Sequence, residues 1–256
     1  MTNNVGTIDL NADMGEGFGP YAFGDDEALL RIVSSANIAC GYHAGDPHTM
    51  RRTVELCLVH GVSVGAHPGL PDRMGFGRRE MRVLPSEVAD WLLYQIGALQ
   101  AIAAAAGATV RHVKPHGALY HMAARDVELA EAVVCAVQGA DSRLRLYGPP
   151  NSRLARESEA RGLPYVAEGF ADRAYLPDGK LVPRSEPGAV LEQPEQVIEQ
   201  SLSLIRTGRV RCHDGSLAEL AVGTICLHGD TPHAAEHAKR LYAGLREAGV
   251  AIRAPE

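Results

Sequence analysis

Histidines stand directly after short apolar segments at four points of this 256-residue chain. An imidazole exchanges protons near neutral pH, so such residues suit general acid and base chemistry. The chain has only 11 histidines, and their recurrence at equivalent points indicates a shared site rather than chance. The four histidines are His43, His67, His116 and His228.

Carboxylates, amides and cations occupy the same kind of position. Carboxylates can activate water, and a lysine or arginine can bind a substrate carboxylate or phosphate. No serine or cysteine lies in a nucleophile-elbow pattern, so activated water is the expected nucleophile. In chain order, the segment ends supply Asn11, Asp13, Glu16, His43, Asp46, His48, His67, Asp72, Arg73, Lys114, His116, Glu168, Asp172, Arg173, His228 and Asp230.

Several of these residues also fit purely structural roles. Asp46 and Asp230 are as well suited to capping helix N-termini as to catalysis. A single histidine at a strand end can equally be a hydrogen-bonded loop residue. The glycine-rich turn at 15–17 lacks both the G-x-G-x-x-G spacing and the Walker pattern, so it does not indicate a nucleotide site.

A metal site is a further option at these segment ends. Asp13, His43 and His48 offer one oxygen and two imidazoles, which would suit Zn²⁺ or another divalent ion with an open position. The step from His43 to His48 crosses a helix start, however, and is not the usual i, i+4 pair. The sequence therefore leaves the presence of a metal open.

Seven strand-to-helix units are expected to position these residues. The strand segments are apolar on both faces, as a parallel sheet covered by helices requires. The helices follow the apolar spacing of one buried face and end at glycines such as Gly61 and Gly107. Strands with their polar ends are expected within 5–11, 38–40, 62–67, 110–117, 144–150, 164–173 and 220–230, and helices at 24–34, 47–61, 85–107, 126–137, 152–161, 194–206 and from 231.

The order of these units predicts an α/β fold. Right-handed crossovers bring the carboxyl ends of parallel strands to one rim, and seven units favour an irregular, TIM-like (β/α) barrel. An open doubly wound sheet is the alternative. No linker divides the chain, so we expect one domain over 1–256, with an inserted loop at about 175–193, a small hairpin at about 209–220 and a short edge strand at 251–252.

Composition narrows the class of protein. The net charge is −6 and the basic residues are scattered, which does not fit a nucleic-acid-binding surface. The five cysteines are isolated and odd in number, as in a reducing compartment. We find no secretory leader and no window that approaches a membrane span, so we expect a soluble, cytoplasmic protein.

Seven motifs together resemble the LamB/YcsF family, whose members are the A subunits of prokaryotic ATP-dependent 5-oxoprolinases. The resemblance extends from about Ile8 to Glu247. The motifs are DLNADMGEGFG at 9–19, NIACGYHAGD at 37–46, GAHPGLPD at 65–72, GFGRR at 75–79, VKPHGALY at 113–120, EGFADR at 168–173 and LHGD at 227–230.

The resemblance implies an irregular barrel related to polysaccharide deacetylases. It also implies conversion of 5-oxo-L-proline, ATP and water to L-glutamate, ADP and phosphate, in a complex with two further subunits, B and C. ATP is then a co-substrate that this chain or a partner subunit binds. Deacetylases carry adjacent aspartates and a two-histidine metal motif, and this chain has Asn11-Ala-Asp13 in place of the paired aspartates.

Residue roles follow as hypotheses from this implied reaction. Asp13 or His67 is expected to act as base for water, and Lys114 with His116 to stabilise a developing oxyanion or phosphate. Arg173 is expected to hold the substrate carboxylate. The remaining substrate-binding residues are expected to be Asn11, His43, Asp46, Asp172 and His228.

Two other functions fit the same residues. One is a metal-dependent hydrolase that acts alone on an amide or N-acetyl substrate. The other is a non-catalytic subunit that binds 5-oxoproline and delivers it to its partners. Activity without ATP would favour the first, and substrate binding without chemistry would favour the second.

Overall fold

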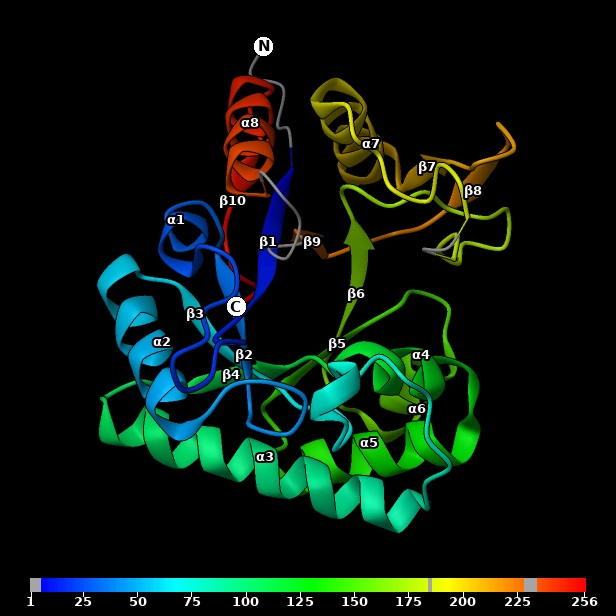
Figure 1. The fold of residues 1–256 in the computed structure, drawn as a ribbon. Coiled ribbons are helices and arrows are strands. Elements are labelled where there is room, and N and C mark those ends of the chain that lie inside the picture. Colours follow the sequence, from blue (N-terminus) through cyan, green and yellow to red (C-terminus); the bar gives the residue numbers. More distant parts are fainter. Residues whose placement is uncertain (1–5, 184–185, 228–233) are drawn as a thin grey trace.

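Seven parallel strands form a closed barrel in the computed structural model, which describes residues 6–183, 186–227 and 234–256 (Figure 1). Neighbours along the chain pair in order, and the last strand returns to β1 and closes the ring. The predicted seven-unit barrel is confirmed, and closure rules out the open sheet. The strands are β1 (Thr7–Met14), β2 (Ser35–Ala39), β3 (Ser63–His67), β4 (Val110–Val113), β5 (Arg145–Gly148), β6 (Tyr165–Phe170) and β9 (Thr224–Leu227).

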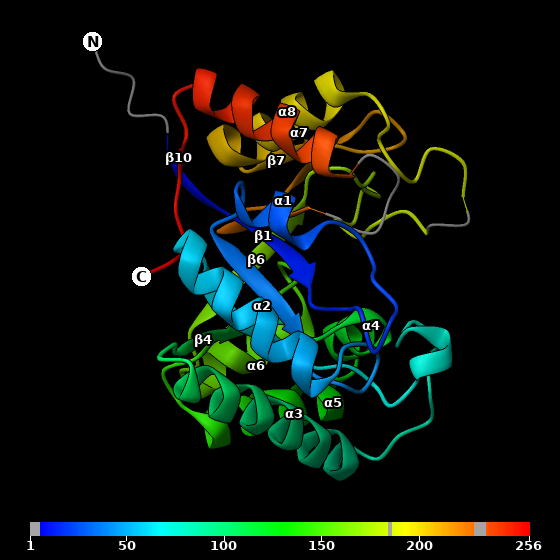
Figure 2. The same cartoon turned by 60° about the vertical axis from the view of Figure 1, so that its left-hand side comes forward.

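Helices surround the barrel on its outer side (Figure 2). The longest, α3, lies beside α5 on one side, and α7 and α8 lie together on the opposite side. A 3-10 turn, η1 (Arg73–Gly75), follows β3. The helices are α1 (Asp26–Leu30), α2 (Pro47–His60), α3 (Pro85–Ala105), α4 (Gly117–Arg125), α5 (Val127–Ala140), α6 (Arg153–Arg161), α7 (Pro194–Thr207) and α8 (Ala234–Glu247).

Local sequence signals explain many of the element boundaries. In α2, the Asp46 side chain accepts a hydrogen bond from the Thr49 amide, Pro47 begins the helix, and Gly61 ends it in the left-handed region. Helix α4 was not predicted, because no side chain at its N-cap bonds to a free amide and its start carries none of the usual signals.

Two strands are longer than predicted. β1 continues past Asn11 to Met14, and β2 begins at Ser35 rather than at residue 38. Both extensions contain polar residues that a search for apolar strands rejects. α1 in turn ends at Leu30 instead of residue 34, and a short turn at 31–34 leads into β2.

The apolar core lies between the strands and the surrounding helices, whereas the space inside the barrel is polar. Alternate β1 residues point inward and hydrogen-bond across to other strands, as Asn11 does to Glu168 and Thr224. The expectation of strands apolar on both faces is therefore wrong for the inner face. Buried polar groups are stable there because they satisfy one another.

A small extension, formed by a hairpin and the segment at 175–193, lies outside the barrel. It contains an antiparallel hairpin of β7 (Arg209–Arg211) with β8 (Leu217–Glu219), within the range where the sequence suggests a hairpin. The segment at 175–193 pairs with it through the Tyr175–Cys212 bridge, as far as that segment is described. The short β10 (Ala251–Ile252) pairs with β1 outside the ring.

Helix α3 is long and apolar enough to cross a membrane, by length and composition only. The expectation that no window approaches a span is therefore wrong on that criterion. The core helix of a soluble protein meets the same criterion, and one stripe of α3 is buried and packs against α5 and the barrel. That stripe consists of Val88, Leu92, Gln95, Ile96, Leu99 and Ala103.

Candidate active site

The predicted catalytic residues converge at the carboxyl ends of three strands. Asp13 lies at the end of β1, His67 is the last residue of β3, and Lys114 and His116 follow β4. The Asp13 carboxylate lies 3.1 Å from the Lys114 ammonium and 3.2 Å from the His67 ring. The four residues therefore belong to one site, as the strand order requires.

A pocket of about 290 Å³ opens over these residues. Its volume suits a small molecule rather than a polymer. The segment after β6 contributes one wall, so the inserted loop borders the pocket. The lining residues are Asp13, His67, Arg78, Glu80, Lys114, Pro115, His116, Gly117, Ala118, Tyr120, His121, Phe170, Arg173, Leu181, Val182 and Pro183.

The Lys114 ammonium is buried between two carboxylates. It lies 2.8 Å from Glu168 and 3.1 Å from Asp13, and it also contacts the Asn11 amide oxygen and the Cys226 sulfur. Asp13 keeps about a quarter of its side chain exposed, whereas Glu168 has none exposed. Asp13 is therefore the carboxylate of this network that substrate or water can reach.

Charge pairing overrides burial in this network. Burial would raise the pKa of Asp13, but the charges of His67 and Lys114 hold it well below its usual value. Burial would likewise lower the pKa of Lys114, but Asp13, Cys226 and Glu168 hold it well above its usual value. At neutral pH the pocket floor thus carries an ionised carboxylate beside a fixed ammonium.

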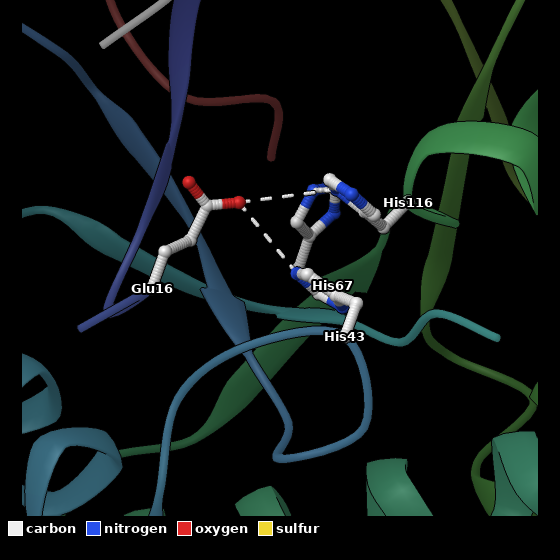
Figure 3. Close-up of side chains that lie close together, drawn as sticks. All are labelled: Glu16, His43, His67 and His116. Carbon is white, nitrogen blue, oxygen red and sulfur yellow. Dashed lines mark hydrogen bonds and ion pairs between the residues drawn. The ribbon is translucent and has the colours of Figure 1, made fainter. Parts of the chain in front are cut away.

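Three imidazoles and the Glu16 carboxylate form a second buried cluster at the same end (Figure 3). His43 lies stacked on His116, with ring centroids 3.7 Å apart. The Glu16 carboxylate lies 3.6 Å from His43 Nε2 and 3.9 Å from His116 Nδ1. His116 Nδ1 in turn lies 2.9 Å from His67 Nε2, which joins this cluster to the Asp13–Lys114 network.

Two glycines make room for the stacked rings. A Cβ atom on Gly69 would stand 2.5 Å from His43 Nδ1, and one on Gly77 would stand 2.7 Å from His43 Cβ and 2.8 Å from His116 Cδ2. Gly77 also has a φ of +64°, which other residues rarely adopt. These loop glycines therefore fix how closely the chain can pack over the cluster.

The predicted substrate-binding residues are placed differently from one another. Asn11 is fully buried and hydrogen-bonded inside the barrel, and Asp46 caps α2 while also accepting from the Gly19 amide. Among the described residues that line the pocket, neither Asp46 nor Asp172 occurs. His228 lies outside the described residues, as does Asp230.

Arg173 lines the pocket but is buried and engaged. Its Nε and Nη2 atoms donate to the backbone carbonyls of Ala189 and Val182, at 3.2 and 2.6 Å. Arg78, which the sequence analysis did not select, is exposed at the pocket and lies over the Phe76 ring. His48 is exposed on the first turn of α2, so the Asp13, His43 and His48 set is not the cluster that forms.

From the sequence, no specific role was assigned to Glu16, Glu168 or His112. The first two were named as segment ends without a role, although a carboxylate next to a strand end is the signal that marked Asp13. His112 lies within β4 and points into the barrel, where its Nε2 donates to the Asn37 side chain at 2.8 Å. Because His112 lies within the strand, a search for polar residues at strand ends did not select it.

A larger cavity of about 830 Å³ lies at the opposite end, where β2, β3 and β4 begin. Arginines from several elements line it, including Arg111 and Arg246. In parallel barrels the chemistry lies at the carboxyl ends of the strands, so the smaller pocket is the candidate active site.

The closed parallel barrel and the ionisable groups at its carboxyl rim define a TIM-like (β/α) barrel protein with a site of enzymatic type. A model described as the LamB/YcsF family matches residues 8–256, and the chain belongs to this family.

Named relatives are similar to this chain over nearly their whole length. The 5-oxoprolinase A subunit of Methylococcus capsulatus is 52% identical over 97% of this chain and 95% of its own. A protein of the same name from Geobacillus kaustophilus is 53% identical over 97% of both chains. A crystal structure described as a lactam utilization protein from Thermus thermophilus superposes with a TM-score of 0.93 at 45% identity, over 97% of this chain and 100% of that one.

Proposed function

We propose that this chain is the A subunit of an ATP-dependent 5-oxoprolinase and that it holds the site where the lactam ring opens. The Asp13–Lys114 pair on the floor of a small pocket is the observation that carries the proposal. Similarity to 5-oxoprolinase A subunits over nearly the full length supports it. 5-Oxoproline is a small anionic lactam and matches the size of the pocket.

The chemistry assigns different tasks to the two members of the pair. Amide resonance makes a lactam a poor electrophile, and phosphorylation of its oxygen by ATP would activate it. Asp13, ionised and partly exposed, would orient and deprotonate water for attack on the ring carbon. Lys114 would stabilise the negative charge that develops there.

Bond changes then complete the ring opening. The ring C–N bond breaks, the nitrogen takes up a proton, and the acyl phosphate that results is hydrolysed by a second water to glutamate and phosphate. His67 Nε2 lies 3.2 Å from Asp13, and a positive charge at that nitrogen would hold the carboxylate in place. His116 would act through its contact with His67.

The substrate carboxylate needs a cation at the pocket wall. We assign it to Arg78, because that side chain is exposed at the pocket. Arg173 donates to two backbone carbonyls of the following segment and would shape the wall that Leu181 and Val182 form.

ATP and the partner subunits remain part of the proposal. The relatives are named as A subunits, which supports assembly with further subunits, here B and C. No glycine-rich phosphate-binding motif occurs in the sequence, so we assign nucleotide binding to one of the partner subunits. A cytoplasmic location agrees with ATP as co-substrate.

Reconstitution tests the proposal directly. The chain alone and the chain with subunits B and C would be assayed for glutamate release with and without ATP. We expect turnover only in the complete, ATP-supplied mixture, and Lys114→Met should reduce it at least about 100-fold. Lys239→Met, on the exposed face of α8, is the matched control and should retain activity.

Two results would contradict this function. Hydrolysis by the chain alone without ATP would favour a stand-alone amide hydrolase. Full activity of Lys114→Met in the complex would make the chain a carrier of 5-oxoproline rather than the catalyst of ring opening.

A further inference from the structure

The histidine–glutamate cluster contains a buried side chain whose polar atoms have no partner. His43 is 1% exposed, and neither of its ring nitrogens has a hydrogen-bond partner among the residues that the structure describes. A buried polar group without a partner costs about 1–3 kcal/mol, so such groups are rare and call for a cause. Its Nε2 faces the Glu16 carboxylate at 3.6 Å.

Backbone carbonyls fix which nitrogens of the other two imidazoles carry hydrogen. His67 Nδ1 lies 2.7 Å from the Lys114 carbonyl oxygen, and His116 Nε2 lies 2.7 Å from the Phe76 carbonyl oxygen. A carbonyl oxygen only accepts, so both of these nitrogens must be protonated. In a neutral imidazole the remaining nitrogen then presents a lone pair.

When both rings are neutral, these two lone pairs point at each other. His67 Nε2 and His116 Nδ1 are 2.9 Å apart, and the Asp13 carboxylate lies 3.2 Å from His67 Nε2. Three electron-rich atoms at such distances repel unless a positive charge stands among them, either an added proton on His67 Nε2 or a metal ion. Histidine ligands of metal ions characteristically donate their other N–H to a carbonyl, as both rings do here.

We propose that this cluster binds one divalent transition-metal ion of the Zn²⁺ type. The ligands are His67 Nε2, His116 Nδ1 and the Glu16 carboxylate, with His43 as the fourth, and their ligand atoms all lie within 4.8 Å of one another. The donor set of three imidazoles and one carboxylate favours Zn²⁺ and its first-row neighbours over Mg²⁺, which prefers oxygen ligands.

The stacking of His43 on His116 indicates that the four ligands contribute unequally to metal affinity. His43 lies parallel to His116, at an interplanar angle of 4°, so the two ring planes do not converge on one point and His43 must tilt to bind. His67 is nearly perpendicular to both rings. We therefore expect His43 to contribute less to metal affinity than His67, His116 or Glu16.

Metal binding can be measured on the chain alone, independently of lactam chemistry. Protein stripped with a chelator would be titrated with Zn²⁺, Co²⁺ or Mg²⁺ by calorimetry, with metal content determined after dialysis. We expect one equivalent of Zn²⁺ in the micromolar range or tighter, a Co²⁺ absorption spectrum in the visible, an increase in Tm with Zn²⁺, and no saturable binding of Mg²⁺.

Variants identify the ligands. His67→Ala and Glu16→Gln should weaken Zn²⁺ binding more than about 100-fold, and His43→Ala about 10-fold. Glu16→Gln preserves the size of the side chain, so it keeps the test valid if an alanine variant fails to fold. His48→Ala changes an exposed histidine five residues from His43 and should retain wild-type affinity.

Clear results would overturn the proposal. Absence of saturable Zn²⁺ binding would mean that a proton, not a metal ion, separates His67 from His116. Undiminished binding by Glu16→Gln and His67→Ala would place any metal elsewhere. Either result would leave the proposed lactam chemistry of Asp13 and Lys114 intact, because that function is tested separately by glutamate release.

Discussion

Two aspartates of β1, Asp9 and Asp13, face the same barrel interior but have opposite electrostatic surroundings. Asp9 is closed off from solvent and accepts hydrogen bonds from four neutral hydroxyl groups. Asp13 lies at the pocket and pairs with a lysine and a histidine. The four donors to Asp9 are Ser34, Ser35, Tyr147 and Thr224.

The pKa values of the two aspartates shift in opposite directions. Burial raises the pKa of Asp9, because hydroxyl donors compensate only part of the lost hydration. The charges around Asp13 outweigh its burial and hold its pKa well below the usual value. Depth in the barrel and the charge of the neighbours, rather than residue type, thus separate a structural carboxylate from a chemical one.

The largest effect on activity is expected from substitution of Asp13, the β1 aspartate at the pocket. Asp13→Asn should lower kcat in the reconstituted complex by about 10²–10⁴-fold, because the amide cannot accept a proton from water. Steady-state glutamate release measures this effect. Asp9→Asn is the matched change on the same strand, and an equal loss of kcat in both variants would abolish the distinction between the two aspartates.

Substitution of Asp9, the β1 aspartate inside the barrel, should reduce the stability of the fold instead. Asp9→Ala removes the shared acceptor of four hydroxyl groups, three of them buried, and should lower the free energy of unfolding by about 2–4 kcal/mol. Urea denaturation followed by circular dichroism measures the loss. Glutamate release per folded molecule should remain near wild type, and a loss of turnover at unchanged stability would contradict the structural role.

His112 stacks on Tyr147 beside Asp9 and should make the free energy of unfolding depend on pH in the acidic range. Burial, followed by the charge of Lys114, lowers the pKa of His112 to about 3. Between about pH 6.5 and 3 the unfolded chain binds a proton that the folded chain does not, so stability falls as pH falls.

The slope from this one histidine is at most about 1.4 kcal/mol per pH unit. His112→Gln should flatten the dependence of unfolding free energy on pH across this window. Urea midpoints measured from pH 7 to pH 4 test it, and parallel curves for the variant and the parent would show that His112 is not kept neutral.

The smallest effect concerns substrate binding at the pocket wall. Arg78→Ala should raise KM for 5-oxoproline about 10-fold with kcat nearly unchanged, because a contact to the substrate carboxylate acts equally in ground and transition states. Arg82→Ala, an exposed arginine that is not among the pocket-lining residues described, is the control. A fall in kcat at constant KM would instead make Arg78 part of the reaction itself.

Several elements of this fold could be predicted from local sequence. The caps of α2, the helix α3 and the β7–β8 hairpin follow from side chains and glycines within a few residues of each boundary. α4 and the polar start of β2 could not, because the former lacks a capping side chain and the latter carries Ser35 and Asn37, whose partners lie on other strands. Helix caps act locally, whereas inward polar residues are stabilised only by partners distant in sequence.

By itself, the sequence determined that ionisable residues follow successive strands and that a right-handed parallel fold must gather them on one rim. Only the tertiary structure decided that Lys114 lies between Asp13 and Glu168, that Arg173 points into backbone carbonyls, and that Glu16 meets three imidazoles. The physical reason is that register and side-chain direction depend on packing across the barrel, and spacing along the chain does not encode them.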